Sequence, residues 1–154
     1  MKKIIIILIT VILIISYITI IKKDNLNVNK GSDNNMTESV KVTINDKEFN
    51  IILEDNKTVK ELIKMLPLEV LMNELNGNEK YYYLEKTLPT DSERVEKIQT
   101  GDVMLFRNNC LVIFYESFKT SFSYTRIGRI ENIKDLKNSL GKDDVIVKLE
   151  RNEK

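Results

Sequence analysis

The side chains of this 154-residue chain that could form a binding site are aromatic rings and one cation in its second half. Aromatic rings offer apolar area and tyrosine adds a hydrogen-bonding tip, so such a set could line a groove for an extended peptide or a small apolar ligand. We take as candidate ligand-binding residues Tyr81, Tyr83, Phe114, Phe122, Tyr124 and Arg126. Phe118 is a further ring in the same region.

Spacing supports part of this set. Phe122, Tyr124 and Arg126 alternate along one predicted strand, so they share a face and place a cation beside two rings. The competing interpretation is plain packing, because half of the rings in alternating strands should point into a core. A solvated surface cluster is a further alternative for the same residues.

The amino-acid composition narrows the catalytic and metal-binding chemistry that this chain could perform. The chain has no His and no Trp, and its one Cys is Cys110. Ser-His-Asp and Cys-His arrangements are therefore excluded, and so is a thiolate zinc cluster. Cys110 lies in an apolar strand and is interpreted as a buried small hydrophobe, with a reactive thiol as the lesser alternative. We assign no catalytic residue, no metal ligand and no cofactor.

Two groups of acidic and amide side chains were weighed as sites. Residues 73–79 are rich in oxygen atoms but lack the ordered ligand spacing of a calcium loop, which favours a hydrogen-bonded turn. Asp143 and Asp144 are adjacent, and neighbouring strand residues face opposite ways, so they make no acid-base pair. We interpret these two acids as solubilising turn residues.

Charge argues against a nucleic-acid partner. The 24 Lys and Arg nearly balance the 23 Asp and Glu, but four of the lysines lie within residues 1–23. The remainder has 20 cations against 23 acids, a net charge of −3. A mildly acidic domain lacks the general attraction to phosphate backbones that drives such binding.

The N-terminus predicts a membrane partner. Ile4 to Ile21 is an uncharged run of 18 residues between lysine pairs, and a helix of that length spans about 27 Å, close to the hydrocarbon thickness. The chain contains no Ala, and no Gly precedes Gly31, so the small residues of a signal-peptidase site are missing. We predict an uncleaved signal anchor over residues 1–23; a signal peptide cut near Ser16 or Thr19 is the alternative.

Orientation and the next segment complete the predicted organisation. A short N-terminal tail with Lys2 and Lys3 normally stays cytoplasmic, which predicts a single-pass protein of a bacterial cell membrane with an extracytoplasmic domain. Residues 24–38 are rich in Asp, Asn, Lys, Gly and Ser, typical of a flexible linker. The folded domain is predicted over 39–150, followed by a charged tail at 151–154.

The domain is predicted to be mainly β. Apolar residues alternate over 40–44 and 49–53 around a turn, which predicts a hairpin. Residues 58–66 have helical spacing with a capping-box start at Thr58, and 133–140 form a second short helix ending at Gly141. Further predicted strands, most of them apolar, cover 68–71, 81–83, 103–106, 110–115, 124–130 and 145–149. Many short strands with two short helices indicate a small closed barrel.

The later strands also resemble a known family. Gly101–Leu105, Asn109–Tyr115 and Tyr124–Ile130 look like the corresponding strands of a small bacterial cyclophilin-like domain. The opening hairpin, the Leu75–Tyr81 turn and the closing helix and strand are similar to the same family, so the resemblance covers about residues 39–150. It implies an eight-stranded barrel with two helices covering its ends.

The resemblance also implies an activity to be weighed. Cyclophilins are peptidyl-prolyl isomerases whose site pairs an Arg with a groove of Phe, Gln, Trp and His. The matching part of this chain, Tyr81–Pro89, has no Arg, and the chain has no Trp or His. Arg126 beside Phe114 or Tyr124 is the available substitute donor. We therefore expect a non-catalytic module binding a peptide or small ligand, with an isomerase of exported proteins as the alternative.

Overall fold

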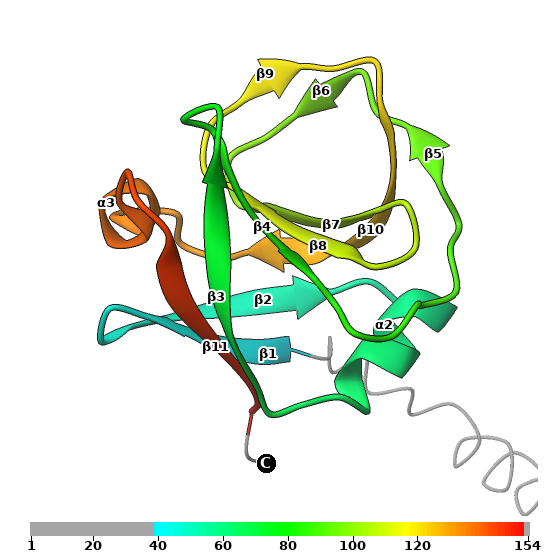
Figure 1. The fold of residues 1–154 in the computed structure, drawn as a ribbon, viewed down its shortest axis with the longest axis horizontal. Helices are drawn as coiled ribbons and strands as arrows, with labels where there is room; N and C mark the ends of the chain where they lie inside the picture. The colour runs from blue at the N-terminus through cyan, green and yellow to red at the C-terminus, as the bar shows by residue number, and fades with distance from the viewer. Residues whose placement is uncertain (1–38, 153–154) are drawn as a thin grey trace, which may run out of the picture. The chain divides into compact units, whose positions relative to one another are not determined.

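The computed structural model describes residues 39–152, which form a closed antiparallel β-barrel with two short helices (Figure 1). The predicted transmembrane helix and linker lie outside the described residues. Within 39–152, neither helix is long and apolar enough to cross a membrane.

The strands and helices follow one another along the chain without large insertions. They are β1 (Ser39–Ile44), β2 (Lys47–Leu53), α2 (Lys57–Ile63), β3 (Leu68–Leu75), β4 (Glu79–Tyr83), β5 (Glu93–Arg94), β6 (Lys97–Ile98), β7 (Asp102–Phe106), β8 (Cys110–Phe114), β9 (Phe118–Lys119), β10 (Ser123–Ile130), α3 (Leu136–Leu140) and β11 (Val145–Arg151). Each long strand overlaps an apolar or aromatic run noted in the sequence, although the run at 68–71 covers only the first half of β3. The two-residue strands β5, β6 and β9 had not been predicted.

Eight strands make the barrel, in the order β2-β1-β11-β3-β4-β8-β7-β10, and pairing of β2 with β10 closes it. The predicted eight-stranded barrel is thus confirmed. Closure requires a close approach at Gly128, which pairs with Leu53, because a Cβ at Gly128 would lie 2.2 Å from the Ile52 carbonyl oxygen. The register of β10 against β7 also shifts between Arg126 and Gly128, as a β-bulge does.

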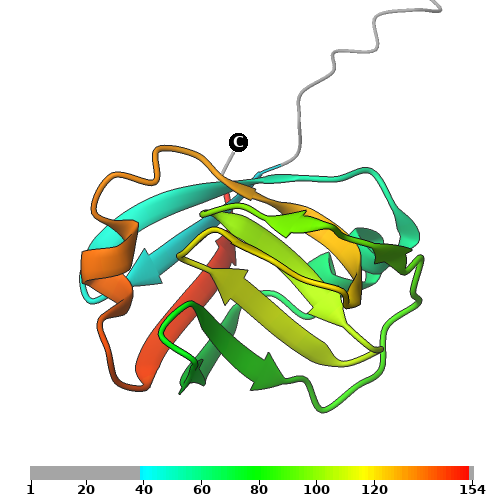
Figure 2. The ribbon, with the colours of Figure 1, turned by 90° about the horizontal axis from the view of Figure 1, so that it is seen from above.

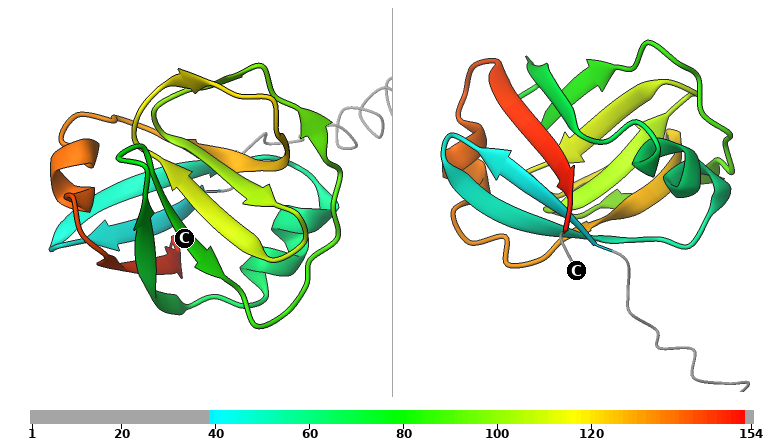
Figure 3. Two further views of the ribbon diagram at one scale, coloured as in Figure 1. Left: turned by 45° about the horizontal axis from the view of Figure 1, so that its top comes forward. Right: turned by 90° about the horizontal axis from the view of Figure 1, so that it is seen from below.

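The two helices lie at opposite ends of β2, as Figures 2 and 3 show. Their buried side chains, Val59 and Leu62 of α2 and Leu136 and Leu140 of α3, join the same cluster inside the barrel. This main cluster is mostly Val, Ile and Leu. Burial of one face of each helix against the inner face of the sheet supplies the main apolar driving force of the fold.

Both helices begin differently from the sequence expectation. The N-cap of α2 is Asn56, whose side-chain oxygen accepts from the Val59 amide at 2.9 Å, while the predicted cap Thr58 donates to the Pro89 carbonyl at 2.6 Å. α3 begins at Leu136 rather than Ile133, because Asp135 has φ 67°, which a helix cannot contain.

A second apolar cluster lies on the outer face of the barrel wall. It consists of Val95, Ile98, Met104, Cys110, Val112, Phe114 and Tyr124. Alternation explains its origin: in β8, Leu111 and Ile113 face the main cluster, whereas Cys110, Val112 and Phe114 face outward. Two segments arch over this side of the barrel (Figure 1): one carries β5 and β6, the other carries β9, and β6 pairs with β9. Val95 and Ile98, from the first segment, belong to the cluster. We call it the outer cluster.

Candidate functional site

An open cleft of about 540 Å³ lies at the edge of the outer cluster. Its wall comes from β4, β8 and the start of β10, and its other side from β9 and the residues that follow it. The lining residues are Leu75, Asn76, Asn78, Glu79, Tyr81, Tyr83, Phe106, Cys110, Val112, Phe118, Lys119, Thr120, Ser121, Phe122 and Tyr124. We call this the outer cleft.

The fold brings four of the six candidate residues together in the outer cleft: Tyr81, Tyr83, Phe122 and Tyr124. Tyr81 and Tyr83 alternate on β4, so they share its outward face, and their rings meet edge to face at a centroid distance of 5.7 Å. Tyr83 and Phe122 are 58% and 59% exposed, which leaves their ring area available to a ligand.

The other two candidates lie elsewhere. Phe114 has no exposed surface and packs beneath the cleft, with its ring centroid 5.6 Å from that of Tyr124 and 5.8 Å from that of Phe118. Packing is therefore its role. Arg126 is exposed and does not line the cleft, even though it alternates with Tyr124 along β10. Alternation along the strand predicted that Phe122, Tyr124 and Arg126 share one face. That face extends beyond the edge of the cleft, so sharing it with Tyr124 does not place Arg126 in the lining. Phe122 lies just before the first residue of β10.

Several functional candidates were missed at the sequence level. Phe106 lines the cleft and contacts both Phe122 and Tyr124, with ring centroids 5.7 and 5.5 Å apart. Phe118 had been named as a ring in this region but left out of the ligand-binding set. The alternation of β7, whose Met104 and Phe106 flank the inward-facing Leu105, was the signal that could have found Phe106.

Glu79 is the missed residue with the most distinctive environment. It occupies the first position of β4, opposite Phe114 of β8, and shares the outward face of Tyr81 and Tyr83. Burial, followed by the charge of Glu74, raises the pKa of Glu79 to about 6. Nothing in the sequence indicated that Glu79 is a half-buried carboxylate beside aromatic rings, because its position after a turn is typical of an exposed polar residue.

Cys110 of β8 pairs with Tyr83 of β4 and lies at the bottom of the same cleft, where its thiol is unreactive. It is 4% exposed, and burial, followed by the charge of Glu79, raises its pKa to about 11. Its thiol therefore stays protonated at neutral pH, where a nucleophile would need the thiolate. The prediction of a buried small hydrophobe is confirmed.

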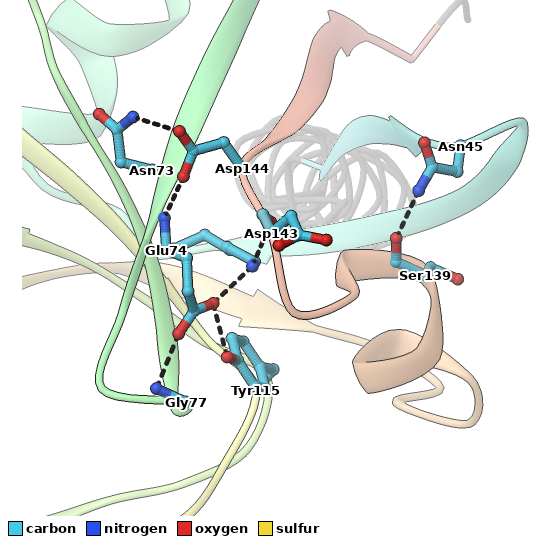
Figure 4. A network of polar contacts seen from close by, with 9 residues as sticks. Asn45, Asn73, Glu74, Gly77, Tyr115, Ser139, Asp143 and Asp144 are labelled. Atoms are coloured by element: carbon cyan, nitrogen blue, oxygen red, sulfur yellow. Dashed lines mark hydrogen bonds and ion pairs between the residues drawn. The ribbon is translucent and has the colours of Figure 1, made fainter.

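On the opposite face of β4, Lys80 is fully buried within a polar network (Figure 4). Its Nζ donates to Glu74 Oε2 at 2.5 Å and to the Asp143 carbonyl at 2.7 Å. The Tyr115 hydroxyl donates to the same Glu74 oxygen at 2.7 Å, and the Gly77 amide donates to Glu74 Oε1 at 2.7 Å. Burial alone would raise the pKa of Glu74, but these hydrogen bonds hold it below its ordinary value.

The acids before β11 belong to the same network. Asp144 accepts from the Glu74 amide at 2.8 Å and from Asn73 Nδ2 at 3.0 Å (Figure 4). Asp143 and Asp144 therefore join the β3–β4 hairpin to β11, which corrects the interpretation that they only solubilise a turn. The expectation of a hydrogen-bonded turn over residues 73–79 is confirmed. In the described part of the chain, no cluster of three or more metal-ligating side chains occurs.

The closed barrel defines the fold class, and comparisons with known proteins add the family. A family model described as the cyclophilin-like family matches residues 42–150, so the chain belongs to the cyclophilin-like family. A hypothetical protein from Archaeoglobus fulgidus with a solution structure is similar in fold, with a TM-score of 0.55 at 20% identity. The match covers 79% of this chain and 100% of that one. A search of curated proteins found no significant match.

Proposed function

We propose that this protein is a membrane-tethered, non-catalytic cyclophilin-like module that binds a peptide or small ligand in the outer cleft. The observation that carries the proposal is the cleft itself. Its volume of about 540 Å³ falls in the range of small-ligand sites, and its aromatic lining is open to solvent rather than filled by the domain's own side chains.

The arrangement favours binding over isomerisation. Proline isomerisation needs a donor beside an apolar slot to stabilise the twisted amide. The sequence offered Arg126 for this task, and Arg126 lies outside the cleft lining. Of the lining residues within 39–152, Lys119 is the one cation, and its side chain is exposed. An isomerase of exported proteins remains the alternative function because of the family to which the chain belongs.

Tethering rests on the sequence. The uncharged run Ile4–Ile21 supports a single-pass anchor in a bacterial cell membrane, with the domain on the extracytoplasmic side. Fractionation of cells tests this: the full-length chain should sediment with membranes and resist release by high salt and alkaline carbonate, but be released by detergent. A soluble chain shortened at its N-terminus would contradict it.

One NMR experiment tests binding and catalysis together. The ¹⁵N-labelled full chain in lipid nanodiscs is titrated with a fragment collection and with a proline-containing tetrapeptide. We expect shifts in the amides of Tyr81, Cys110 and Tyr124, and no exchange broadening of the peptide's cis and trans resonances beyond that of protein-free nanodiscs. Accelerated exchange that Tyr83→Ala removes would establish the isomerase instead. Failure of every fragment and of the tetrapeptide to shift the cleft amides would contradict a binding role.

A further inference from the structure

Two hydrogen-bond acceptors in the outer cleft have no donor. The Glu79 carboxylate is half-buried and makes no hydrogen bond or ion pair with any residue of 39–152. The side-chain oxygen of its neighbour Asn78, which also lines the cleft, is buried without a partner. Buried acceptors are nearly always satisfied in folded proteins, so the Asn78 oxygen is an exception. The Glu79 carboxylate beside it offers a ligand in the cleft an acceptor that no donor of 39–152 occupies.

The charges around Glu79 leave it uncompensated. On β3, the Glu74 carboxylate repels it and is itself neutralised by Lys80 on the other face of β4. The titratable groups that feel its charge are the Cys110 thiol of β8, the Tyr115 phenol just after β8 and the Tyr124 phenol of β10, and burial raises the pKa of each. These three groups are therefore neutral near pH 7 and supply no positive charge.

Two cationic side chains, those of Lys119 and Arg107, line the cleft or contact a ring of its lining. Lys119 of β9 lines the cleft, but it is exposed and lies opposite Lys97 of β6. Arg107 lies outside the lining, with its guanidinium carbon 5.5 Å from the centroid of the Phe106 ring. Water screens exposed charges more strongly than a half-buried carboxylate, so Glu79 contributes most to the recognition of charge within the cleft.

We propose that the outer cleft is a site for a small organic molecule carrying a primary ammonium group next to an apolar or aromatic body. The ammonium hydrogens satisfy the Glu79 carboxylate and Asn78 Oδ1, while the rings of Tyr81, Tyr83 and Phe122 surround the cation and its apolar carbon atoms. The cleft volume of about 540 Å³ fits a small ligand better than an extended chain. The inference rests on the proposed binding function and names its ligand class.

The test uses three probes that share a phenylethyl body and differ in the charge of the group at its end. 2-Phenylethylammonium, neutral 2-phenylethanol and anionic 3-phenylpropionate are each titrated into the ¹⁵N-labelled full chain in nanodiscs of zwitterionic lipid, and the cleft amides report binding. We expect the ammonium to bind about tenfold more tightly than the alcohol at about pH 7.5, and the propionate to bind least. At about pH 5 the ammonium affinity should fall about tenfold, because Glu79 becomes protonated as the pH passes through its pKa.

Variants separate this inference from the binding function. Glu79→Gln should reduce the ammonium preference to within about twofold of the alcohol, and Asn78→Ala should weaken the ammonium about threefold. The matched control Lys97→Gln, at an exposed lysine outside the cleft lining, should leave the preference intact. Equal binding of all three probes would overturn the ammonium assignment and leave the binding function standing. Tighter binding of the propionate than of the ammonium probe would also overturn it, and a cleft that none of the probes shifts would do the same.

Discussion

The charged side chains on the two faces of β4 differ in whether they have a partner within the chain. Lys80, toward the barrel, is fully buried, and its ammonium group bonds to Glu74 and to the Asp143 carbonyl. Glu79, one residue earlier and on the cleft side, is half-buried without a partner. The comparison teaches that the barrel side of β4 satisfies its charged group from within the chain, whereas the cleft side leaves a carboxylate for a ligand to satisfy.

The apolar residues of the two regions differ as well. The main cluster inside the barrel is largely aliphatic, whereas the outer cluster and the cleft are rich in Phe and Tyr. Aliphatic side chains fill a closed interior to high density, and rings at an open edge retain faces that a ligand can use. Four substitutions, given from the largest expected effect to the smallest, test whether the barrel interior and the cleft differ in this way in their effects on stability and binding.

Phe114→Ala should give the largest loss, because it empties the centre of the outer cluster. Phe114 has no exposed surface and contacts both Tyr124 and Phe118. We expect the free energy of unfolding to fall by about 4 kcal/mol in urea titrations. Ring-resonance shifts of Tyr124 should accompany it. A loss below about 1 kcal/mol would mean that the outer cluster adds little to the fold.

Lys80→Met should destabilise the barrel by about 3 kcal/mol, because it leaves the buried side of Glu74 without its cation. Urea unfolding measures the change. The matched control is Lys119→Met, an exposed lysine, which should change stability by less than about 0.5 kcal/mol. Equal effects of the two substitutions would contradict a structural role for the buried network.

Glu79→Gln should stabilise the protein by about 1 kcal/mol at neutral pH, after allowance for solvent screening of a half-buried group. The sign follows from a raised pKa: the folded state holds the proton more tightly than the unfolded state does. Stability therefore falls as pH rises from the ordinary glutamate range through about 6, and the variant should lack that fall. Unfolding curves across this pH range measure it, and an unchanged profile in the variant would refute the assignment.

Arg126→Ala should have the smallest effect, because Arg126 is exposed and lies outside the cleft lining. We expect stability within about 0.5 kcal/mol of the parent and unchanged affinity for any cleft ligand. Affinity measured by NMR titration beside Tyr83→Ala, which removes a lining ring, provides the comparison. A larger loss for Arg126→Ala than for Tyr83→Ala would restore the pairing inferred from the sequence.

The barrel could be predicted because its signals are local. Alternating apolar residues mark the long strands, and positive φ angles at Asn45, Asp46, Asn76 and Gly77 occur in residue types suited to tight turns. The strands β5, β6 and β9 could not be found, because two residues show no periodicity and their pairing depends on distant partners. The start of α3 was also misplaced, because no residue pattern in Ile133–Asp135 indicates that the backbone of Asp135 adopts the left-handed conformation.

The site was predicted in part for the same reason. Tyr81, Tyr83 and Tyr124 were found because parity and residue type suffice to place rings on one face. Glu79 and Asn78 were missed because their significance lies in an absent partner, which only the folded arrangement reveals. Arg126 lies outside the cleft lining, because parity says which face a residue occupies and not where a cleft ends.

The most direct measurement follows the carboxyl carbon of Glu79 by NMR across a pH titration, in the free protein and with saturating 2-phenylethylammonium. The account predicts a pKa of about 6 in the free protein and a clear decrease when the ammonium is bound. A pKa in the ordinary glutamate range in the free protein, or one that the ammonium leaves unchanged, would contradict it.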